Sequence, residues 1–245
     1  MTFEMMSPAM RPSTRAEYAS QWADESAHLD SFGIYRDLAN LISERRVLEI
    51  GCGTGRGTAQ IAKEGAVLAI DNNDVLLAEA RRHNAGSKNV AFCHADLFDM
   101  PDTARRMIAE FGPTVIVGWF LGGSGADVAV HTTEQPELVA KGKLYREKIE
   151  DIITADPFLV PSVEHIHLVN RSGRIAECSD GEVIEATIKD YDEHVFHRCG
   201  FAVAEVSLFD WPLQGSRFRY GAADNPNLAP GTVIPTITAI SARRR

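Results

Sequence analysis

Hydrophobic and polar positions change their spacing along this chain in a regular way from residue 46 onward. Short runs rich in Val, Ile, Leu and Ala are typical of strands that are buried on both faces. Between most of these runs, apolar residues recur with the spacing of a helix. Strands are expected at residues 46–50, 66–71, 89–96, 114–120, 164–170, 201–211 and 232–242, and helices at 58–65, 75–84, 102–112, 136–152 and 187–200.

This alternation predicts an α/β fold with a doubly wound, mostly parallel, seven-stranded sheet covered by helices on both faces. The last two expected strands follow each other without a helix between them. We therefore expect an antiparallel hairpin at one edge of the sheet, joined by the turn-rich residues 217–231.

The beginning of the chain has a different character. Residues 13–30 are expected to form a helix, because Thr14 and Glu17 have the spacing of a capping box. Tyr18 and Trp22 lie four residues apart on one face of it. We expect a single domain over residues 1–245, with a helical N-terminal lid segment at 1–44 and an α/β core at 45–245.

Composition narrows the classes of partner. The formal net charge of −9 disfavours nucleic acid, whose backbone calls for a basic field. The four cysteines lack paired spacing and no apolar run is long enough to span a membrane, so a cytoplasmic protein is expected. His165 and His167, and His194 and His197, do not match the spacing of a zinc site, and no metal is expected.

The stretch RRVLEIGCGTGRGT at residues 45–58 puts a glycine-rich turn directly behind the first expected strand. Such a turn lets the backbone approach a ligand closely. The dinucleotide fingerprint fails, because Arg56 and Thr58 stand where its third glycine belongs in the two possible registers. Glu49 would repel a pyrophosphate and attract an ammonium group. The loop therefore favours a ligand with an amino-acid end.

With these residues, the chain resembles the class I S-adenosylmethionine-dependent methyltransferases, a Rossmann-like family, from about residue 45 to residue 119. The motifs are VLEIGCGTG, AVLAID and CHADLFDM, each at the end of an expected strand. The resemblance implies S-adenosylmethionine as cofactor, with Glu49 at its methionine end, Asp71 on the ribose hydroxyls and Asp96 on the adenine amino group. The cofactor-binding residues that it implies are Glu49, Gly51, Cys52, Gly53, Gly55, Asp71, Asn72, Asp96 and Leu97.

The acceptor is less defined by the sequence. The fourth strand ends in GWFLGGSG and not in an NPPY-type motif, which disfavours DNA-base and release-factor substrates. Trp119 and Phe120 are expected to form one wall of a substrate pocket, with Tyr18 and Trp22 in its lid. His131 and Asn170 are weak candidates for a residue that orients or deprotonates the acceptor, and no catalytic residue is assigned.

These observations favour methyl transfer to a small-molecule metabolite by in-line displacement in a lidded pocket. Three alternatives stay open. The same pocket could promote attack of the cofactor's own amine on the neighbouring carbon, which forms a ring and releases methylthioadenosine. A protein could be the substrate, in which case the cleft should be exposed. A non-catalytic cofactor-binding protein is the third alternative.

Overall fold

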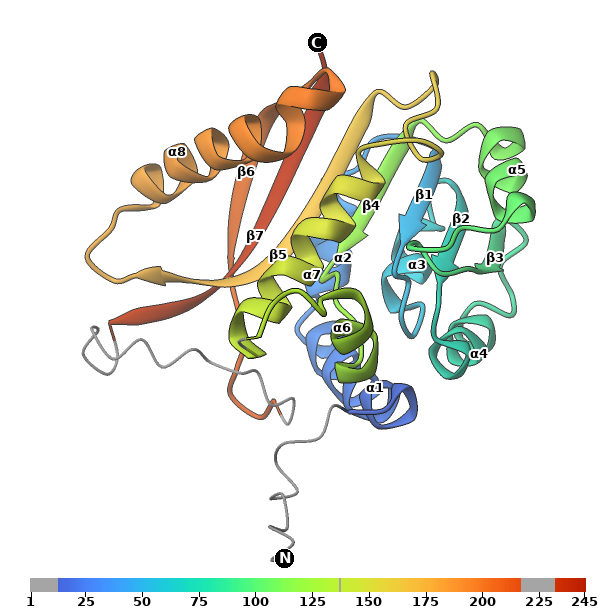
Figure 1. Cartoon of the computed structure of the whole chain (residues 1–245), viewed down its shortest axis with the longest axis horizontal. Coiled ribbons are helices and arrows are strands. Elements are labelled where there is room, and N and C mark those ends of the chain that lie inside the picture. The colour runs from blue at the N-terminus through green and yellow to red at the C-terminus, as the bar shows by residue number, and fades with distance from the viewer. Residues whose placement is uncertain (1–12, 137, 217–231) are drawn as a thin grey trace, which may run out of the picture.

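The architecture is that of a computed structural model, which describes residues 13–136, 138–216 and 232–245. Helices surround one mixed sheet, as Figure 1 shows. The strands are β1 Arg46–Ile50, β2 Ala66–Asp71, β3 Val90–His94, β4 Val115–Trp119, β5 His165–Ile175, β6 Phe201–Asp210 and β7 Val233–Arg244. The helices are α1 Arg15–Ser31, α2 Ile34–Ala39, α3 Arg56–Ile61, α4 Asp74–His83, α5 Asp102–Phe111, α6 Gly125–His131, α7 Leu138–Ile153 and α8 Asp180–Tyr191.

The sheet confirms the predicted seven strands and their mostly parallel arrangement. The strand order is β3-β2-β1-β4-β5-β7-β6. Strands β1 to β5 are parallel, whereas β7 pairs antiparallel with both β5 and β6. Because the chain first builds outward from β1 to β3 and then restarts at β4, the order reverses between β1 and β4. Ligands of open α/β sheets bind at the carboxyl ends of the strands beside such a reversal.

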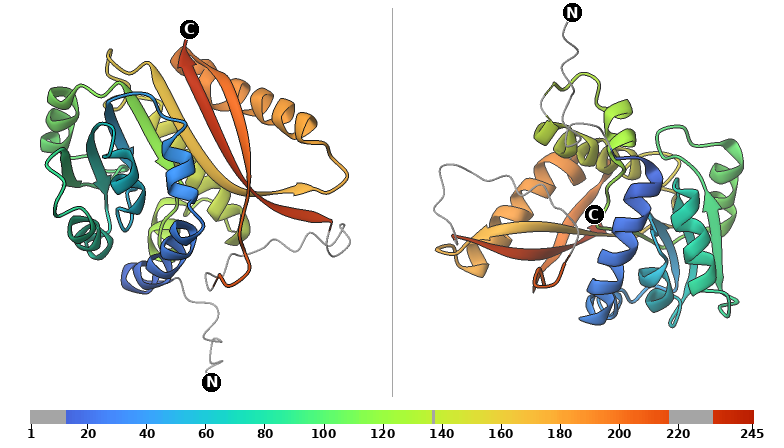
Figure 2. Two further views of the ribbon diagram at one scale, coloured as in Figure 1. Left: turned by 180° about the vertical axis from the view of Figure 1, so that it is seen from behind. Right: turned by 90° about the horizontal axis from the view of Figure 1, so that it is seen from below.

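Each face of the sheet carries its own buried core, and the view from below in Figure 2 shows helices on both faces. Alternate residues of a strand point to opposite faces. In β1, Leu48 and Ile50 pack with residues of α5, α7 and α8. Val47 packs with residues of α1, α2, α3 and α4. The expectation of helices on both sides of a buried parallel sheet is therefore confirmed.

Helix α1 begins with the expected capping box. The Thr14 hydroxyl accepts a hydrogen bond from the backbone N–H of Glu17, and the Glu17 carboxylate accepts one from the Thr14 N–H at 2.8 Å. In Figure 1 the helix lies beyond the carboxyl ends of the parallel strands, near α4 and α6. Its apolar face, which includes Trp22 and Leu29, is buried in the core that contains Val47 of β1.

Four features differ from the expected elements. Helices α2 and α6 were not predicted, β5 runs five residues past its expected end to Ile175, and α8 begins at Asp180 rather than at residue 187. Both α6 and α8 start with capping boxes, from Ser124 and Ser179 respectively. Helix α8 continues as a π-helix, Asp192–Phe196, and a 3-10 turn, His197–Cys199, that ends at Gly200 as expected. The expected hairpin connection at 217–231 lies outside the described residues.

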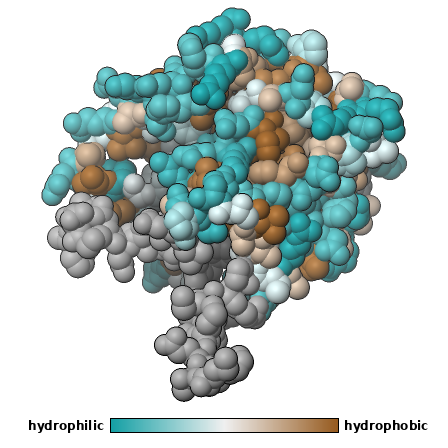
Figure 3. All heavy atoms as spheres, in the orientation of Figure 1, coloured by the Kyte–Doolittle hydropathy of each residue, from teal (hydrophilic) through white to brown (hydrophobic). Residues whose placement is uncertain are grey.

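The surface agrees with the acidic composition. Figure 3 shows a face on which hydrophilic side chains dominate and hydrophobic ones form small groups. Large exposed apolar side chains such as Phe32, Val130 and Val233 belong to separate parts of the fold. Across the described ranges, the helices include none with the length and apolar character that crossing a bilayer requires.

Candidate functional site

The glycine loop leaves the carboxyl end of β1 and leads into α3. Gly51, Gly53 and Gly55 have positive φ angles of 68°, 54° and 75°, a region that favours glycine over every residue with a Cβ. A Cβ on Gly53 would lie 2.5 Å from Nε1 of Trp22. The glycines thus serve both the turn and the close approach of α1 to the loop. Between them, Cys52 is buried, and burial raises the pKa of its thiol.

Asp71 ends β2 beside this loop. One of its carboxylate oxygens accepts from the N–H of Gly53 and the other from the N–H of Asn73, each at 2.8 Å. Burial raises the pKa of Asp71 to about 6, and the two backbone hydrogen bonds oppose that rise. Each oxygen keeps a further lone pair, because a carboxylate can accept about four hydrogen bonds in total.

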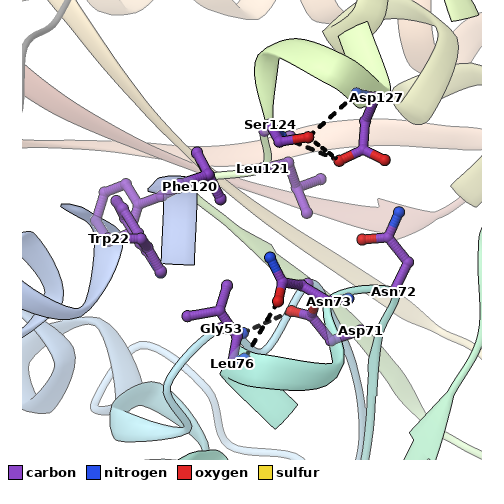
Figure 4. A pocket seen from close by; sticks show the side chains of 14 residues that line it. Trp22, Gly53, Asp71, Asn72, Asn73, Leu76, Phe120, Leu121, Ser124 and Asp127 are labelled. Atoms are coloured by element: carbon purple, nitrogen blue, oxygen red, sulfur yellow. Dashed lines mark hydrogen bonds between the residues drawn. The ribbon is translucent and has the colours of Figure 1, made fainter. Parts of the chain in front are cut away.

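Asp71 is common to two neighbouring recesses at the carboxyl ends of the strands. The first lies under α1, and Figure 4 shows Trp22 and Phe120 on one side of it, with Ser124 and Asp127 across from Asn72. The second lies between the ends of β2 and β3 and helix α7. Both are lined by Gly51, Asp71, Asn72, Leu121 and Gly122.

The second recess contains the predicted Asp96 and Leu97. Asp96 is half-buried, and one of its carboxylate oxygens accepts from the N–H of Phe98 at 3.0 Å. Phe98 and Tyr145 also line this recess, and their rings stack with centroids 5.4 Å apart. The sequence analysis did not identify these two aromatic residues. Phe98 lies two residues after the expected acid, Asp96, and is the clearer of the two signals.

The start of α1 is bound to the rim of the site. The Arg15 guanidinium donates to one carboxylate oxygen of Asp127 from Nε at 2.9 Å and from Nη2 at 2.6 Å. The same Nη2 lies 3.7 Å from the second carboxylate oxygen of Asp96. The side-chain amide of Asn73 donates to the Arg15 carbonyl, and Ser13 accepts from the first backbone N–H groups of α6. Arg15 thus joins α1 to the acids of both recesses.

Of the four predicted pocket and lid residues, three line the first recess and one does not. Tyr18, Trp22 and Phe120 line the first recess. Trp119 instead lies in the core, where its indole N–H donates to Nδ1 of His167 at 2.8 Å. Trp119 shares its side of β4 with Val117, whose neighbours belong to the core under α1 to α4, and strand alternation therefore directs it away from the recess.

Glu49 also lies behind the loop and is not among the residues that line the two recesses. Its carboxylate accepts a hydrogen bond from the Thr58 hydroxyl at 2.5 Å, and the side chain is 4% exposed. Burial raises the pKa of Glu49 to about 8. It points to the same face of β1 as Val47, under the first turn of α3, as the alternation along the strand requires.

The two weak catalytic candidates lie on separate elements. His131 ends α6, and its ring stacks on Phe98 with centroids 3.9 Å apart, so it supports a wall of the second recess. Asn170 lies on β5, on the face of the sheet opposite to that of Val169. It donates to the Tyr191 hydroxyl, which in turn donates to Glu150 at 3.0 Å. The structure therefore does not bring His131 and Asn170 together.

His165 and His167, the first histidine pair, lie in the buried core. His165 is buried and forms hydrogen bonds with Glu44 at 3.0 Å and with Ser241 at 2.7 Å. Burial lowers the pKa of its neighbour His167 to about 3. Within residues 13–136, 138–216 and 232–245, His, Cys, Asp and Glu side chains form no group of three or more that could hold a metal ion.

Comparison with known proteins agrees with this geometry. Residues 47–111 match the family model described as "Methyltransferase domain". A demethylmenaquinone methyltransferase from Clavibacter sepedonicus is 39% identical over 75 residues, which are 29% of this chain. The chain spans only about a third (31%) of the length of that relative.

Solved structures with related folds share little sequence with this chain. The 23S rRNA methyltransferase ErmE is 17% identical, with a TM-score of 0.49 over 87% of this chain and 68% of its own. A TehB-like S-adenosylmethionine-dependent methyltransferase from Corynebacterium glutamicum is 16% identical, with a TM-score of 0.47 over 93% of this chain and 98% of its own. Residues 47–111 are therefore similar to the methyltransferase domain family, and the strand order with its flanking helices is a Rossmann-like α/β fold.

Proposed function

We propose that this chain is an S-adenosylmethionine-dependent methyltransferase that acts on a small-molecule metabolite. One observation carries the proposal most directly. Asp71 is held by the backbone of the glycine loop and of Asn73, and its carboxylate lies where the two recesses meet. A ligand that fills both recesses would therefore pass this carboxylate.

The side chains present fit the cofactor. Asp71 has free lone pairs for two ribose hydroxyls, since each of its oxygens accepts one backbone hydrogen bond. In the second recess, Asp96 provides an acceptor for an exocyclic amine, and Leu97 and Phe98 provide apolar contacts for a flat ring. At the loop, Gly51 and Gly53 leave room for backbone contact with the methionine end. A Cβ on Gly53 would meet Trp22, so only glycine fits between the loop and α1 at this position.

Glu49 has a more indirect part in this proposal. It carries a buried carboxyl group directly behind the loop, with a pKa near 8 in the ligand-free chain. A cation bound at the loop would stabilise the ionised form of Glu49. Glu49 thus supplies negative charge to the methionine end through the field, while its direct hydrogen bond goes to Thr58.

The chain's own contribution to the reaction is alignment and exclusion of water. S-adenosylmethionine, when bound, supplies a methyl group on a positively charged sulfonium. Tyr18, Trp22 and Phe120 line the recess beside the loop and are placed to hold an acceptor in line. Helix α1 covers this recess, and the Arg15–Asp127 ion pair keeps it there. No general base is assigned, and an acceptor that is already nucleophilic needs none.

The proposal that the acceptor is a small molecule rests on the position of helix α1 over the first recess. The first recess lies under α1 and is also lined by Gly122, Gly123, Ser124 and Asp127. A recess covered in this way suits a small acceptor better than a folded domain. We propose that residues 1–245 act as one domain, in which the segment 1–44 is the lid of the core at 45–245. An exposed cleft would instead have favoured a protein substrate.

Product analysis of the full chain tests this proposal. The protein is incubated with S-adenosylmethionine, with and without a pool of small metabolites, and the adenosine products are separated by mass spectrometry. Formation of S-adenosylhomocysteine that depends on the pool is expected. Methylthioadenosine formed without any acceptor would indicate the ring-forming reaction instead. If neither product formed, the result would contradict the proposed activity.

A further inference from the structure

Arg171 lies where aromatic side chains from three elements meet. Its guanidinium carbon is 4.9 Å from the ring centroid of Trp22 on α1 and 5.6 Å from that of Phe120 at the end of β4. It is 5.8 Å from the ring centroid of Trp211, which follows β6. All three distances lie within the range of cation–π attraction, about 6 Å. We call Arg171 with these three residues the arginine–aromatic cluster.

The backbone holds this cluster firmly. Arg171 is two residues beyond Val169 on β5, so both side chains face the same side of the sheet. The Val169 carbonyl accepts a hydrogen bond from the N–H of Phe120 at 2.8 Å. Phe120 has a φ of +56°, which is rare for a bulky residue and is kept only where the surroundings demand it. The strained turn places the buried Phe120 ring beside both Trp22 and Arg171.

The cluster adjoins the recess under α1. Trp22 and Phe120 belong to both, and Tyr18 lines the recess as well. Burial raises the pKa of Tyr18 to about 12, and the positive charge of Arg171 opposes that rise. Since Tyr18 feels this charge, its field reaches the recess. The acids that line the recess are Asp71 and Asp127, of which Asp127 is paired with Arg15.

We propose that Arg171 selects an acceptor that carries a carboxylate, and that the rings of Trp22, Phe120 and Trp211 hold the flat or apolar part of that acceptor. A guanidinium is planar, stacks on aromatic faces and can bind a carboxylate through two parallel hydrogen bonds. Apolar rings around it exclude water and strengthen the ion pair. Arg171 is half-buried, and part of its surface is accessible. This inference rests on the proposed function and adds the substrate class.

The test compares acids with their neutral amides. The full chain, with and without saturating S-adenosylhomocysteine, is titrated calorimetrically with benzoate, 3-phenylpropionate and indole-3-acetate and with the corresponding amides. At least one acid should bind about tenfold more tightly than its amide. Arg171→Met should reduce this preference to within about twofold, and Arg171→Lys should keep part of it.

A matched control lies on the same strand. Arg174 pairs with Asp180 at 3.2 Å, away from the cluster, and Arg174→Met should keep the preference for acids. Melting curves of each variant establish that it is folded. Wild-type protein that binds each amide as well as its acid would overturn the proposal, and so would a preference for acids that survives in Arg171→Met.

The cofactor's own carboxylate is the rival ligand for Arg171. One outcome to test is that Arg171→Met weakens the binding of S-adenosylhomocysteine by more than about tenfold and leaves the binding of methylthioadenosine unchanged. In that case Arg171 would bind the carboxylate of the cofactor, and the proposal would be wrong. Failure of the wild type to bind S-adenosylhomocysteine would contradict the proposed function. The titrations of acids and amides in the absence of S-adenosylhomocysteine would still test whether Arg171 binds a carboxylate.

Discussion

At the scale of single residues, burial governs the ionisation of the acids around the glycine loop. It raises the pKa of Asp71 to about 6 and that of Glu49 to about 8. The sequence predicted Asp71 and Asp96 at the ends of neighbouring strands, and both line a recess there, Asp71 as the last residue of β2 and Asp96 two residues beyond β3. Glu49 and Trp119, by contrast, are not among the residues that line the two recesses. Both lie within strands, and alternation turns them into the core below the loop.

Loss of the Asp71 charge should weaken cofactor binding. Asp71→Asn keeps an oxygen in place but removes charge-assisted hydrogen bonds to ribose, each worth roughly 1.5–3 kcal/mol before compensation by water. We expect affinity for S-adenosylhomocysteine to fall by about tenfold to a hundredfold in calorimetric titration. Asp74→Asn, on an exposed position in the first turn of α4, is the control and should stay close to wild type. Unchanged binding by a folded Asp71→Asn variant would remove Asp71 from the site.

Glu49 should make the ligand-free protein less stable as the pH rises. Its folded pKa of about 8 lies above the ordinary value of 4.5, so the folded state binds the extra proton between these values. The free energy of unfolding should therefore decrease through this window, by up to about 1.4 kcal/mol per pH unit.

Comparison of Glu49→Gln with wild type between about pH 6.5 and pH 8 separates the contribution of Glu49 from those of Asp71 and His167, because these two groups are the same in both proteins. Glu49→Gln preserves an acceptor for Thr58 and should flatten the decline in denaturant unfolding curves. A variant whose decline in this window equals that of wild type would show that Glu49 does not titrate there.

At the scale of elements, α1 both covers the site and braces the fold. Trp22 lies over Gly53, while Leu29 of the same helix is fully buried in the core beside β1. The sequence predicted this helix through its capping box and its aromatic face. It missed α6 and the start of α8, although both begin with the same kind of capping signal, at Ser124 and Ser179. Helix α6, with seven residues, carries too few apolar repeats to stand out from a loop.

Arg15 should slow the release of a bound cofactor, because its guanidinium joins α1 to Asp127 and approaches Asp96. Arg15→Met keeps the aliphatic part of the side chain and removes the ion pair. Since Arg15 is partly exposed, a modest effect is expected, and the dissociation rate of S-adenosylhomocysteine should rise by about threefold to tenfold in stopped-flow experiments. Gln21→Ala, on an exposed position of the same helix, should leave the rate unchanged. Equal rates for Arg15→Met and wild type would mean that this ion pair does not hold the cover.

At the scale of the whole molecule, the strand order explains why the site lies where it does. The reversal between β1 and β4 opens the sheet at its carboxyl end, and the glycine loop, Asp71 and Phe120 all lie there. Hydrophobic patterning was sufficient to predict this fold, because strands buried on both faces leave a strong signal. It could not predict the contacts of Arg171, which depend on how β5, β6 and α1 converge from distant parts of the sequence.

Titration of the chain of residues 1–245 with S-adenosylhomocysteine, with NAD as the comparison, tests the central claim most directly. A ligand that binds only the folded state raises its melting temperature. We predict saturable binding of S-adenosylhomocysteine, a higher melting temperature in its presence, and no change with NAD. Stabilisation by NAD alone, or no response to either compound, would contradict the assignment of the two recesses to S-adenosylmethionine.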